Sequence, residues 1–352
     1  MERETVQIYE RRAADWRDAR PPTLVHEAHA LGTATAPGAV TVDLGCGPGS
    51  YLPHLKWPTV ALDAALAMLR LAREAAPDTW PVQADLEALP FRRGALGAGW
   101  ARASYLHVRT ERLPAALADL HRALAVGAPA TISVLAGEAD GAWPDDDFPG
   151  RWFAAWSGDR LGDVLVGAGF DLGSIDVRGT WLTAHVIRAR TLPDTVGPGM
   201  RVLVCGLNPS VYSADAGIGF ARPGNRFWPA AIAAGLVTVD RDTRAALAAG
   251  IGMTDLVKRA TPRADELTRD EYRAGVARVE RLVQWLQPGA VCFVGLAGWR
   301  AAVDRHAVAG EQPDGIGGRP AYVMPSTSGL NARTPPSDLA DHLRAAAALA
   351  DS

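Results

Sequence analysis

The sequence predicts an α/β protein of two domains, and three observations lead to this prediction. With 352 residues, 48% of them hydrophobic and 21% charged, the chain is long and apolar enough for two packed cores. Strand-like apolar runs alternate with helical patterns in both halves, which favours parallel sheets. Proline and glycine concentrate at 192–199, as is typical of an interdomain linker. We therefore expect domains at 1–191 and 200–352, joined by a linker at 192–199.

Composition narrows the class of protein. Up to 197 the chain has 19 Lys and Arg against 24 Asp and Glu, and from Pro198 it has 17 against 15, so neither part is a basic tail. No apolar run of about 18 residues is present, and charged residues open the chain where an export signal needs an apolar core. We therefore expect a cytoplasmic protein without a membrane partner.

The three cysteines carry no metal-binding pattern. Cys46, Cys205 and Cys292 lie far apart in the sequence, and none belongs to a CxxC motif or a Cys/His cluster. We expect buried free thiols and no metal site.

The first domain begins its sheet with an apolar run at 39–44 that opens into a turn containing Gly45, Gly47 and Gly49. Glycines at such a turn let the backbone approach a ligand closely, as in nucleotide-binding βαβ units. A second strand at 59–63 ends in Asp63, where a carboxylate can reach ribose hydroxyls. A third strand leads to another acid, Asp85.

Together these segments resemble the class I S-adenosylmethionine-dependent methyltransferases, over about 9–190. The resemblance implies a Rossmann-like fold, S-adenosylmethionine as cofactor, a methyl acceptor that the sequence does not identify, a helix at 113–124 and a last antiparallel strand at 179–190. The cofactor-binding residues that it implies are Asp43, Gly45, Gly47, Gly49, Asp63 and Asp85.

Two features of this domain leave alternatives open. The segment 92–100 lacks the acid that this family usually has before its fourth strand, so methyl transfer is either weakened or lost. Positioning dominates this chemistry, and the sequence therefore names no catalytic base. His107 either touches the acceptor or is a satisfied structural residue.

The second domain has two polar loops that each follow a strand. The strand at 201–205 leads into GLNPS at 206–210, and a later strand leads into MPSTSGLN at 324–331. In an open α/β sheet, ligands bind outside the carboxyl ends of the strands. We expect both loops to border one cleft.

Five ordered segments of this half resemble the mismatch-specific uracil/thymine-DNA glycosylases of the uracil-DNA glycosylase superfamily, over about 202–343. They are GLNPS, GFARPGNRFW, GMTDLVKRAT, the strand at 290–295 and MPSTSGLNA. The resemblance implies an α/β/α sandwich with a parallel sheet. It also implies extrusion of a nucleotide from the duplex and hydrolysis of its N-glycosidic bond.

The resemblance gives roles to residues around the first loop. Asn208 would position the attacking water, because an amide oxygen accepts a hydrogen bond but cannot take up a proton as a carboxylate does. The alternative for Asn208 is an Asx-turn residue that shapes the strand exit. Leu207, Ser213 and Phe220 would contact the extruded base, with the Phe220 ring as a stacking platform; ordinary core packing is the alternative for Phe220.

The second loop would supply a wedge. Ser328, Gly329 and Leu330 match the segment inserted into the vacated base stack, where an apolar side chain opposes the return of the base. Asn331 and Arg333 either hold the DNA strands or belong to an exposed loop.

Asp255 departs from the family's usual pattern. Its carboxylate, close to Asn208, would either act as an added base or repel DNA phosphates, and we expect the activity-enhancing, catalytic role. Lys258, Arg259 and Arg263 form either a local basic patch or ordinary surface cations.

The leading functional prediction is a monofunctional DNA repair glycosylase fused to a methyltransferase-like domain. Its substrate would be double-stranded DNA with uracil, thymine or a damaged pyrimidine opposite guanine, and the glycosylase domain would need no cofactor. The alternative is a small-molecule or nucleobase methyltransferase in which the glycosylase fold is an accessory binding module.

Overall fold

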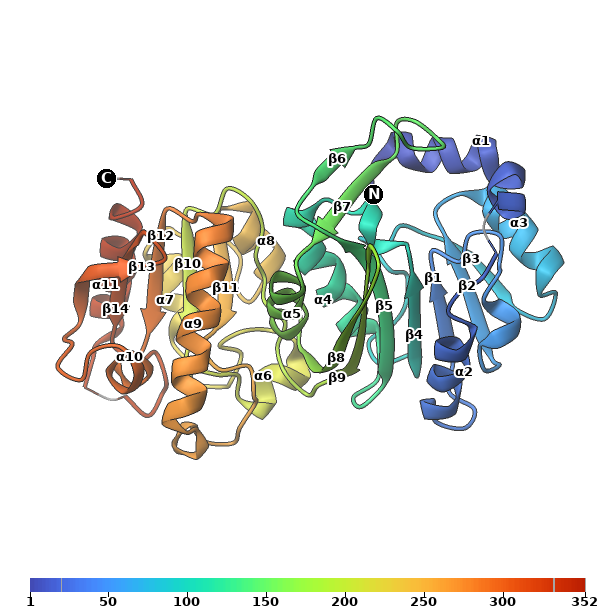
Figure 1. The fold of residues 1–352 in the computed structure, drawn as a ribbon. Helices are drawn as coiled ribbons and strands as arrows, with labels where there is room; N and C mark the ends of the chain where they lie inside the picture. The colour runs from blue at the N-terminus through green and yellow to red at the C-terminus, as the bar shows by residue number, and fades with distance from the viewer. Residues whose placement is uncertain (20, 332, 352) are drawn as a thin grey trace. The chain divides into compact units, whose positions relative to one another are not determined.

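The computed structural model describes residues 1–19, 21–331 and 333–351, which divide into two compact units (Figure 1). The first unit comprises Met1–Val166 and Phe170–Ala189, and the second comprises Gly167–Gly169 and Arg190–Ser352. Across the described part of the chain, no helix is both long and apolar enough to cross a membrane.

The sheet of the first unit has a parallel core. Strands β3, β2, β1, β4 and β5 lie side by side in this order and run parallel, and β9 pairs with β5 in the antiparallel sense. This arrangement confirms the expected Rossmann-like order and the last antiparallel strand. The strands are β1 (Thr41–Leu44), β2 (Thr59–Asp63), β3 (Trp80–Gln83), β4 (Ala98–Arg102), β5 (Pro129–Ala136), β6 (Asp140–Ala142), β7 (Trp152–Trp156), β8 (Phe170–Arg178) and β9 (Trp181–Arg188).

Five α-helices accompany this sheet, and the expected helix at 113–124 is confirmed as α4. They are α1 (Arg3–Ala19), α2 (Val25–Ala34), α3 (Leu66–Ala75), α4 (Leu113–Ala123) and α5 (Gly158–Gly167), with short 3-10 turns η1 (Leu52–His54), η2 (Tyr105–His107) and η3 (Thr110–Arg112). The glycine turn after β1 packs tightly on α3, since a β-carbon at Gly49 would lie 2.8 Å from Cα of Ala72. A side chain there would separate the turn from the helix.

The sheet of the second unit has the order β11-β10-β12-β14-β13, with only β13 antiparallel to its neighbour. Its strands are β10 (Val202–Gly206), β11 (Ile251–Asp255), β12 (Ala290–Val294), β13 (Gly310–Ile316) and β14 (Arg319–Met324). Gly206 pairs with Asp255 and Val294 pairs with Met324, so the loops that follow these four strands leave from one edge of the sheet.

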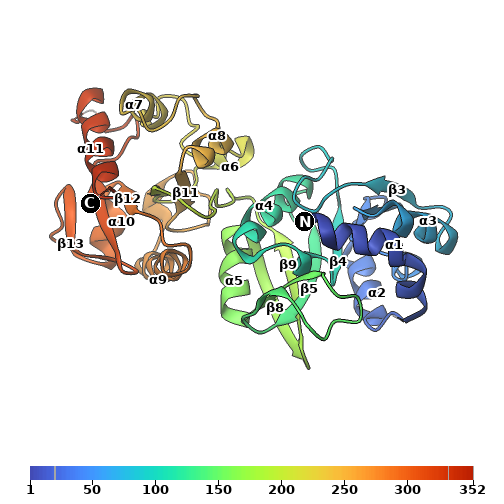
Figure 2. The same cartoon turned by 90° about the horizontal axis from the view of Figure 1, so that it is seen from above.

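Helices cover both faces of this sheet, because residues along each strand alternate between two cores. Leu203 and Cys205 pack in a core that includes α9 and α10, whereas Val202 and Val204 pack in a core that includes α7 and α11. Figure 2 shows α9 on the opposite side of the strands from α7 and α11. This is the α/β/α sandwich that the sequence predicts. The helices are α6 (Val211–Ala216), α7 (Phe227–Ala233), α8 (Thr243–Ala248), α9 (Arg269–Leu286), α10 (Leu296–Ala302) and α11 (Pro336–Ala348), with a 3-10 turn η4 (Ala264–Glu266).

The segment 192–199 is built into the second unit. Its Asp194 is buried, where it accepts hydrogen bonds from Thr254 (2.7 Å), Lys258 (2.7 Å) and Arg278 (2.8 Å). Burial alone would raise the pKa of Asp194, but the charges of Arg278 and Lys258 hold it below its ordinary value. This ion cluster joins the segment to β11 and α9.

Candidate functional site

The corner at the end of β10 brings two predicted site residues, Asp255 and Phe220, to one place. A β-carbon on Gly206 would lie 2.5 Å from Oδ1 of Asp255 and 3.4 Å from Cζ of Phe220. Glycine at this position therefore leaves room for a carboxylate and an aromatic ring beside the strand end.

The side-chain amide of Asn208 follows two residues later, and its orientation is fixed. Its Nδ2 donates to Oγ1 of Thr261 at 2.8 Å and to the carbonyl oxygen of Arg259 at 3.0 Å. The Thr261 hydroxyl gives its own hydrogen to the carbonyl oxygen of Arg263 at 2.7 Å, so it can only accept from Asn208. Turning the amide over would place its oxygen against two acceptors. The oxygen of Asn208 is consequently the group left to accept a hydrogen bond from elsewhere.

The segment that holds Asn208 is itself tied to α9. Arg259 donates to both carboxylate oxygens of Glu271, at 2.6 and 3.1 Å. The hydrogen bond from Arg259 is the main reason that the pKa of Glu271 falls to about 2. Glu271 also caps α9 together with Thr268, so the orientation of Asn208 depends on the start of this helix.

Asp255 is buried, with only 8% of its surface exposed. Its carboxylate nevertheless has no hydrogen-bond partner among the described residues. Burial raises its pKa to about 6, the nearby charge of Lys258 lowers it, the charge of Asp194 raises it and the charge of Arg278 lowers it. A carboxylate in this state can accept a hydrogen bond or a proton from water.

Phe220 lies in a strained backbone conformation, with a φ of +57° that residues other than glycine rarely adopt. Its ring stacks on Phe227 with a centroid distance of 4.2 Å and an interplanar angle of 22°, and remains partly exposed. Trp228 fixes the same loop by donating to the carbonyl oxygen of Gly219 at 2.8 Å. The side-chain oxygen of Asn225 accepts a hydrogen bond from the N–H of Phe227, the first residue of α7, at 2.9 Å.

Ser213 and Leu207 have different surroundings. Ser213 is buried in α6, and its hydroxyl accepts a hydrogen bond from Ser210 at 3.1 Å. The Leu207 side chain packs toward the core formed with α9 and α10, close to Gly298. If Leu207 contacts a base, it therefore does so through its backbone.

The loop after β14 projects an apolar side chain into solvent, since Leu330 is 88% exposed. Arg226 holds the loop by donating to the carbonyl oxygens of Thr334 (2.7 Å), Ser328 (3.4 Å) and Asn331. The Asn331 side chain turns inward and donates to the carbonyl oxygen of Ser326 at 2.8 Å. Gly329 lies against the loop before α7, because a β-carbon there would lie 2.8 Å from the carbonyl oxygen of Gly224.

Cations near this loop differ in their partners. Arg222 and Arg333 are exposed and form no ion pair with any described residue. Of the basic patch considered from the sequence, Lys258 pairs with Asp194, Arg259 pairs with Glu271 and Arg263 pairs with Asp265. The unpaired charge of the second unit near Leu330 thus resides on Arg222 and Arg333.

The first unit contains a cavity of about 540 Å³ at the glycine turn. Of the predicted cofactor residues, Asp43, Gly45, Gly47 and Asp63 line it. Gly49 instead packs against α3, and Asp85 lines a neighbouring cavity of about 480 Å³.

Asp63 organises the end of the larger cavity at the glycine turn. Its carboxylate accepts from the N–H of Gly47 at 2.9 Å and from the N–H of Ala65 at 2.8 Å. Burial raises its pKa to about 6 although these hydrogen bonds lower it. The remaining lone pairs of the carboxylate can accept hydrogen bonds from hydroxyl groups. Asp43 is buried beside it, and burial raises the pKa of Asp43 well above its ordinary value.

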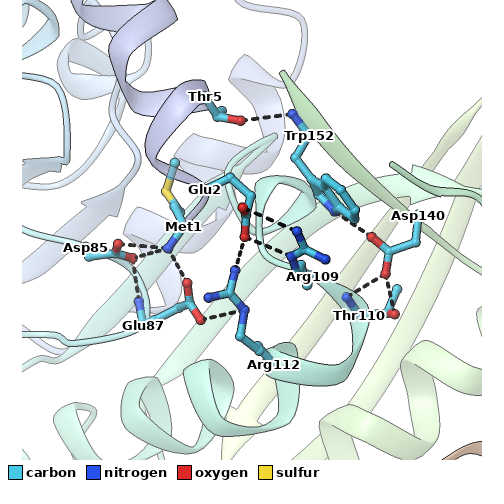
Figure 3. A network of polar contacts seen from close by, with 10 residues as sticks. All are labelled: Met1, Glu2, Thr5, Asp85, Glu87, Arg109, Thr110, Arg112, Asp140 and Trp152. Atoms are coloured by element: carbon cyan, nitrogen blue, oxygen red, sulfur yellow. Dashed lines mark hydrogen bonds and ion pairs between the residues drawn. The ribbon is translucent and has the colours of Figure 1, made fainter. Parts of the chain in front are cut away.

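Polar contacts hold Met1, Glu2 and Thr5 against the rest of the first unit, as Figure 3 shows. Glu2 accepts from Nε of Arg109 at 2.9 Å and pairs with Arg112. The Thr5 hydroxyl accepts from the N–H of Trp152 at 2.9 Å, and the Met1 amine lies 2.8 Å from Asp85. These contacts fix α1, which brings Tyr9 and Trp16 to the cavity.

Sequence reasoning missed Thr261, Arg226 and the ion cluster around Asp194. Arg226 and Thr261 both lie inside segments that carried the resemblance, but their partners come from distant parts of the chain. The three cysteines are buried and free, as predicted. Among residues 1–19, 21–331 and 333–351, no cluster of three or more metal-ligating side chains occurs.

Comparison with known proteins identifies two domains. Residues 193–349 match the family model of the uracil DNA glycosylase superfamily, and residues 42–131 match a methyltransferase domain model.

Solved structures similar to this chain include three methyltransferases. They are an S-adenosylmethionine-dependent methyltransferase from Mesorhizobium loti (20% identity, 47% of this chain and 100% of that chain, TM-score 0.38), one from Methanosarcina mazei (14%, 48% and 97%, 0.40) and the 1,6-didemethyltoxoflavin-N1-methyltransferase from Burkholderia thailandensis (17%, 52% and 87%, 0.42). The two family matches show that the chain contains a methyltransferase domain followed by a domain of the uracil DNA glycosylase superfamily.

Proposed function

We propose that the second unit is a monofunctional DNA glycosylase that removes uracil, and also thymine or modified pyrimidines, opposite guanine. The observation that carries this proposal is the orientation of Asn208. Because its Nδ2 hydrogens are bound by Thr261 and Arg259, its oxygen is the atom that holds the attacking water. The match to the uracil DNA glycosylase superfamily supports the same assignment.

Phe220 and Asp255 complete the proposed base pocket. Both side chains approach Gly206 closely, so an extruded base that stacks on Phe220 lies near the Asp255 carboxylate. Asp255 accepts a proton from the water as the sugar develops carbocation character. Ser213 and the backbone of Leu207 border the base edge.

Leu330 fills the gap left by the extruded nucleotide, with Ser328 and Gly329 shaping the loop that carries it. Its 88% exposure leaves the side chain available for this role. Arg333 and Arg222 contact phosphates on either side of this wedge, and the inward-turned Asn331 keeps the loop in shape.

For the first unit we propose methyl transfer from S-adenosylmethionine. Asp63 binds the ribose hydroxyls, and the turn with Gly45 and Gly47 supports the methionine part, next to buried Asp43. Gly49 maintains the turn on α3, and Asp85 faces the adenine. When bound, the cofactor supplies an activated methyl group, and the protein contributes alignment of the acceptor.

Excision assays test the glycosylase. Duplexes with G·U, G·T or A·U pairs are incubated with the full chain, and abasic sites are cleaved and quantified, with and without S-adenosylmethionine. We expect abasic sites in G·U, fewer in G·T and the fewest in A·U. Absence of excision from all three duplexes would refute the proposal.

A further inference from the structure

One end of the 540 Å³ cavity is lined by residues other than those proposed to bind the cofactor. This end is lined by Tyr9, His107 and Arg151, together with the aromatic rings of Trp16, Trp143 and Phe153. Tyr9 comes from α1 and His107 from the turn after β4, so the end is assembled from distant parts of the first unit.

The three polar residues form a hydrogen-bond chain with a fixed direction. Nδ1 of His107 lies 2.6 Å from the carbonyl oxygen of Trp152, which can only accept, so Nδ1 carries a hydrogen. Burial lowers the pKa of His107 to about 4, so the ring is neutral near pH 7 and its Nε2 is an acceptor. The Tyr9 hydroxyl, 2.7 Å from Nε2, must therefore donate to His107.

The direction of this chain restricts what Tyr9 can bind. Its oxygen has given its hydrogen to His107, and one of its lone pairs accepts from Nη1 of Arg151 at 2.9 Å. One lone pair is left. A molecule that pairs with the Tyr9 oxygen must therefore donate a hydrogen, which a carboxylate, an ether or a carbonyl group cannot do.

The aromatic rings of the lining favour a flat aromatic molecule. Trp143 and Phe153 stack with a centroid distance of 4.8 Å and an interplanar angle of 28°, and Trp16 packs edge-on against Tyr9 at 5.4 Å. The charge of Arg151 is already matched by the buried Asp146, whose Oδ2 accepts from Nε at 2.8 Å. Rings of this kind bind aromatic bodies by stacking and edge contacts.

We propose that this end of the cavity binds the methyl acceptor, and that the acceptor is an aromatic hydroxyl compound which the first unit converts to a methyl ether. The proposal rests on methyl transfer by this unit. As the bond between the methyl carbon and the cofactor sulfur breaks, the sulfur keeps the electron pair and the acceptor oxygen forms the new bond to carbon. The hydroxyl proton passes to the Tyr9 oxygen while the Tyr9 proton passes to Nε2 of His107.

The weak basicity of His107 distinguishes a hydroxyl group from an alkylamine. A hydroxyl proton becomes strongly acidic as the new bond to oxygen forms, so an imidazole with a pKa of about 4 suffices to take it up. A methylated alkylamine is a much stronger base than this imidazole and would keep its proton. Burial also raises the pKa of Tyr9 to about 12, which keeps its hydrogen on the oxygen until transfer begins.

Two matched probes test the site. 2-Naphthol and 2-methoxynaphthalene share one aromatic body, but only the naphthol can donate a hydrogen bond. Each is titrated by calorimetry into the full chain saturated with S-adenosylhomocysteine. We expect naphthol to bind about five- to tenfold more tightly, in line with one hydrogen bond, and we expect Tyr9→Phe to abolish this preference. The affinity of Tyr9→Phe for S-adenosylhomocysteine should equal that of the wild type, which shows that the variant is folded.

Equal affinities for the two probes, binding of neither, or a preference that survives in Tyr9→Phe would overturn the proposal. Turnover with S-adenosylmethionine supplies the second readout, in which 2-naphthol should yield its methyl ether. No turnover of bound naphthol also contradicts the assignment. Failure to bind S-adenosylhomocysteine would instead refute methyl transfer by this unit, and with it the acceptor site.

Discussion

Asp63 and Asp255 occupy equivalent places in the two units, and their environments differ. Each ends a parallel strand beside a glycine corner, and burial raises the pKa of each to about 6. Asp63 accepts two backbone N–H groups, whereas the Asp255 carboxylate has no hydrogen-bond partner among the described residues. The same pKa can therefore belong to a carboxylate that is organised for binding or to one that is free to take up a proton.

The two corners also differ in what the glycines permit. In the first unit, Gly47 brings a backbone N–H to Asp63. In the second unit, Gly206 makes room for the side chains of Asp255 and Phe220, and Asn208 supplies the polar group. We infer that the first corner binds a ligand and the second performs chemistry on one.

Apart from Asn208→Ala, removal of the Asp63 carboxylate should have the largest effect among the variants that follow. Asp63→Ala removes the proposed ribose acceptor and should weaken S-adenosylmethionine binding about 10- to 100-fold, as expected for lost hydrogen bonds to a charged group. Calorimetric titration of the full chain measures this change. Asp159→Ala, which removes an exposed acid at the start of α5, should bind as the wild type does. Equal losses in both variants would remove Asp63 from the binding site.

Thr261 tests whether the orientation of Asn208 matters. Thr261→Val keeps the shape of the side chain but removes the acceptor for Nδ2, so the amide can turn and the excision rate should fall about tenfold. Thr261→Ser retains the hydroxyl and should restore most of the rate. Single-turnover kinetics on a G·U duplex separates the two, and similar rates for Val and Ser would show that the hydroxyl does not position Asn208.

The pH dependence of excision tests whether Asp255 acts as a base. The wild-type rate should rise as pH increases through about 6, because the carboxylate then ionises and can accept a proton. Asp255→Asn should flatten this rise and lower the rate about tenfold at pH 8. If the variant follows the wild-type profile, Asp255 is not a base.

Stability gives a second readout for the same variant. A carboxyl whose pKa is raised by folding lowers stability as pH increases from about 4 to 6, and the loss persists above that range. Asp255→Asn should therefore stabilise the protein against urea by about 1–3 kcal/mol at pH 8 and by little at pH 4. A destabilised variant at pH 8 would mean that the carboxylate has a stabilising partner.

Arg222 should produce the smallest effect. Arg222→Gln should weaken duplex binding about three- to tenfold and reduce the slope of log affinity against log salt by about 1, because one phosphate contact is lost. Arg273→Gln, on the exposed side of α9, is the matched control and should leave both quantities unchanged. An unchanged salt slope in Arg222→Gln would exclude a phosphate contact.

Much of the fold could be predicted from the sequence, because apolar runs and glycine turns are local signals. The run at 201–205 forms β10, and the amphipathic stretch at 269–286 forms α9. The candidate site was harder to predict from the sequence. The fixed amide of Asn208 requires Thr261, which lies 53 residues away, and the organisation of Asp63 requires a backbone N–H 16 residues earlier. Such pairings depend on tertiary contacts that no local pattern encodes.

The ion pairs could not be predicted from the sequence either. Lys258 follows β11 and looks like a surface cation in sequence, yet its Nζ lies 2.7 Å from buried Asp194. Arg278 lies on an amphipathic helix but donates to the same carboxylate. Charged residues of this kind can be assigned only when their partners from other elements are known.

Single-turnover excision of uracil from a G·U duplex by the wild type and by Asn208→Ala tests the central claim most directly. The claim is that the fixed amide oxygen of Asn208 holds the attacking water. We expect the wild type to produce abasic sites and Asn208→Ala to be slower by at least about 100-fold, in the range observed when a single positioned polar group is removed from an active site. Duplex affinity and the urea midpoint of the variant should match those of the wild type. Excision at an undiminished rate by folded Asn208→Ala would contradict the account.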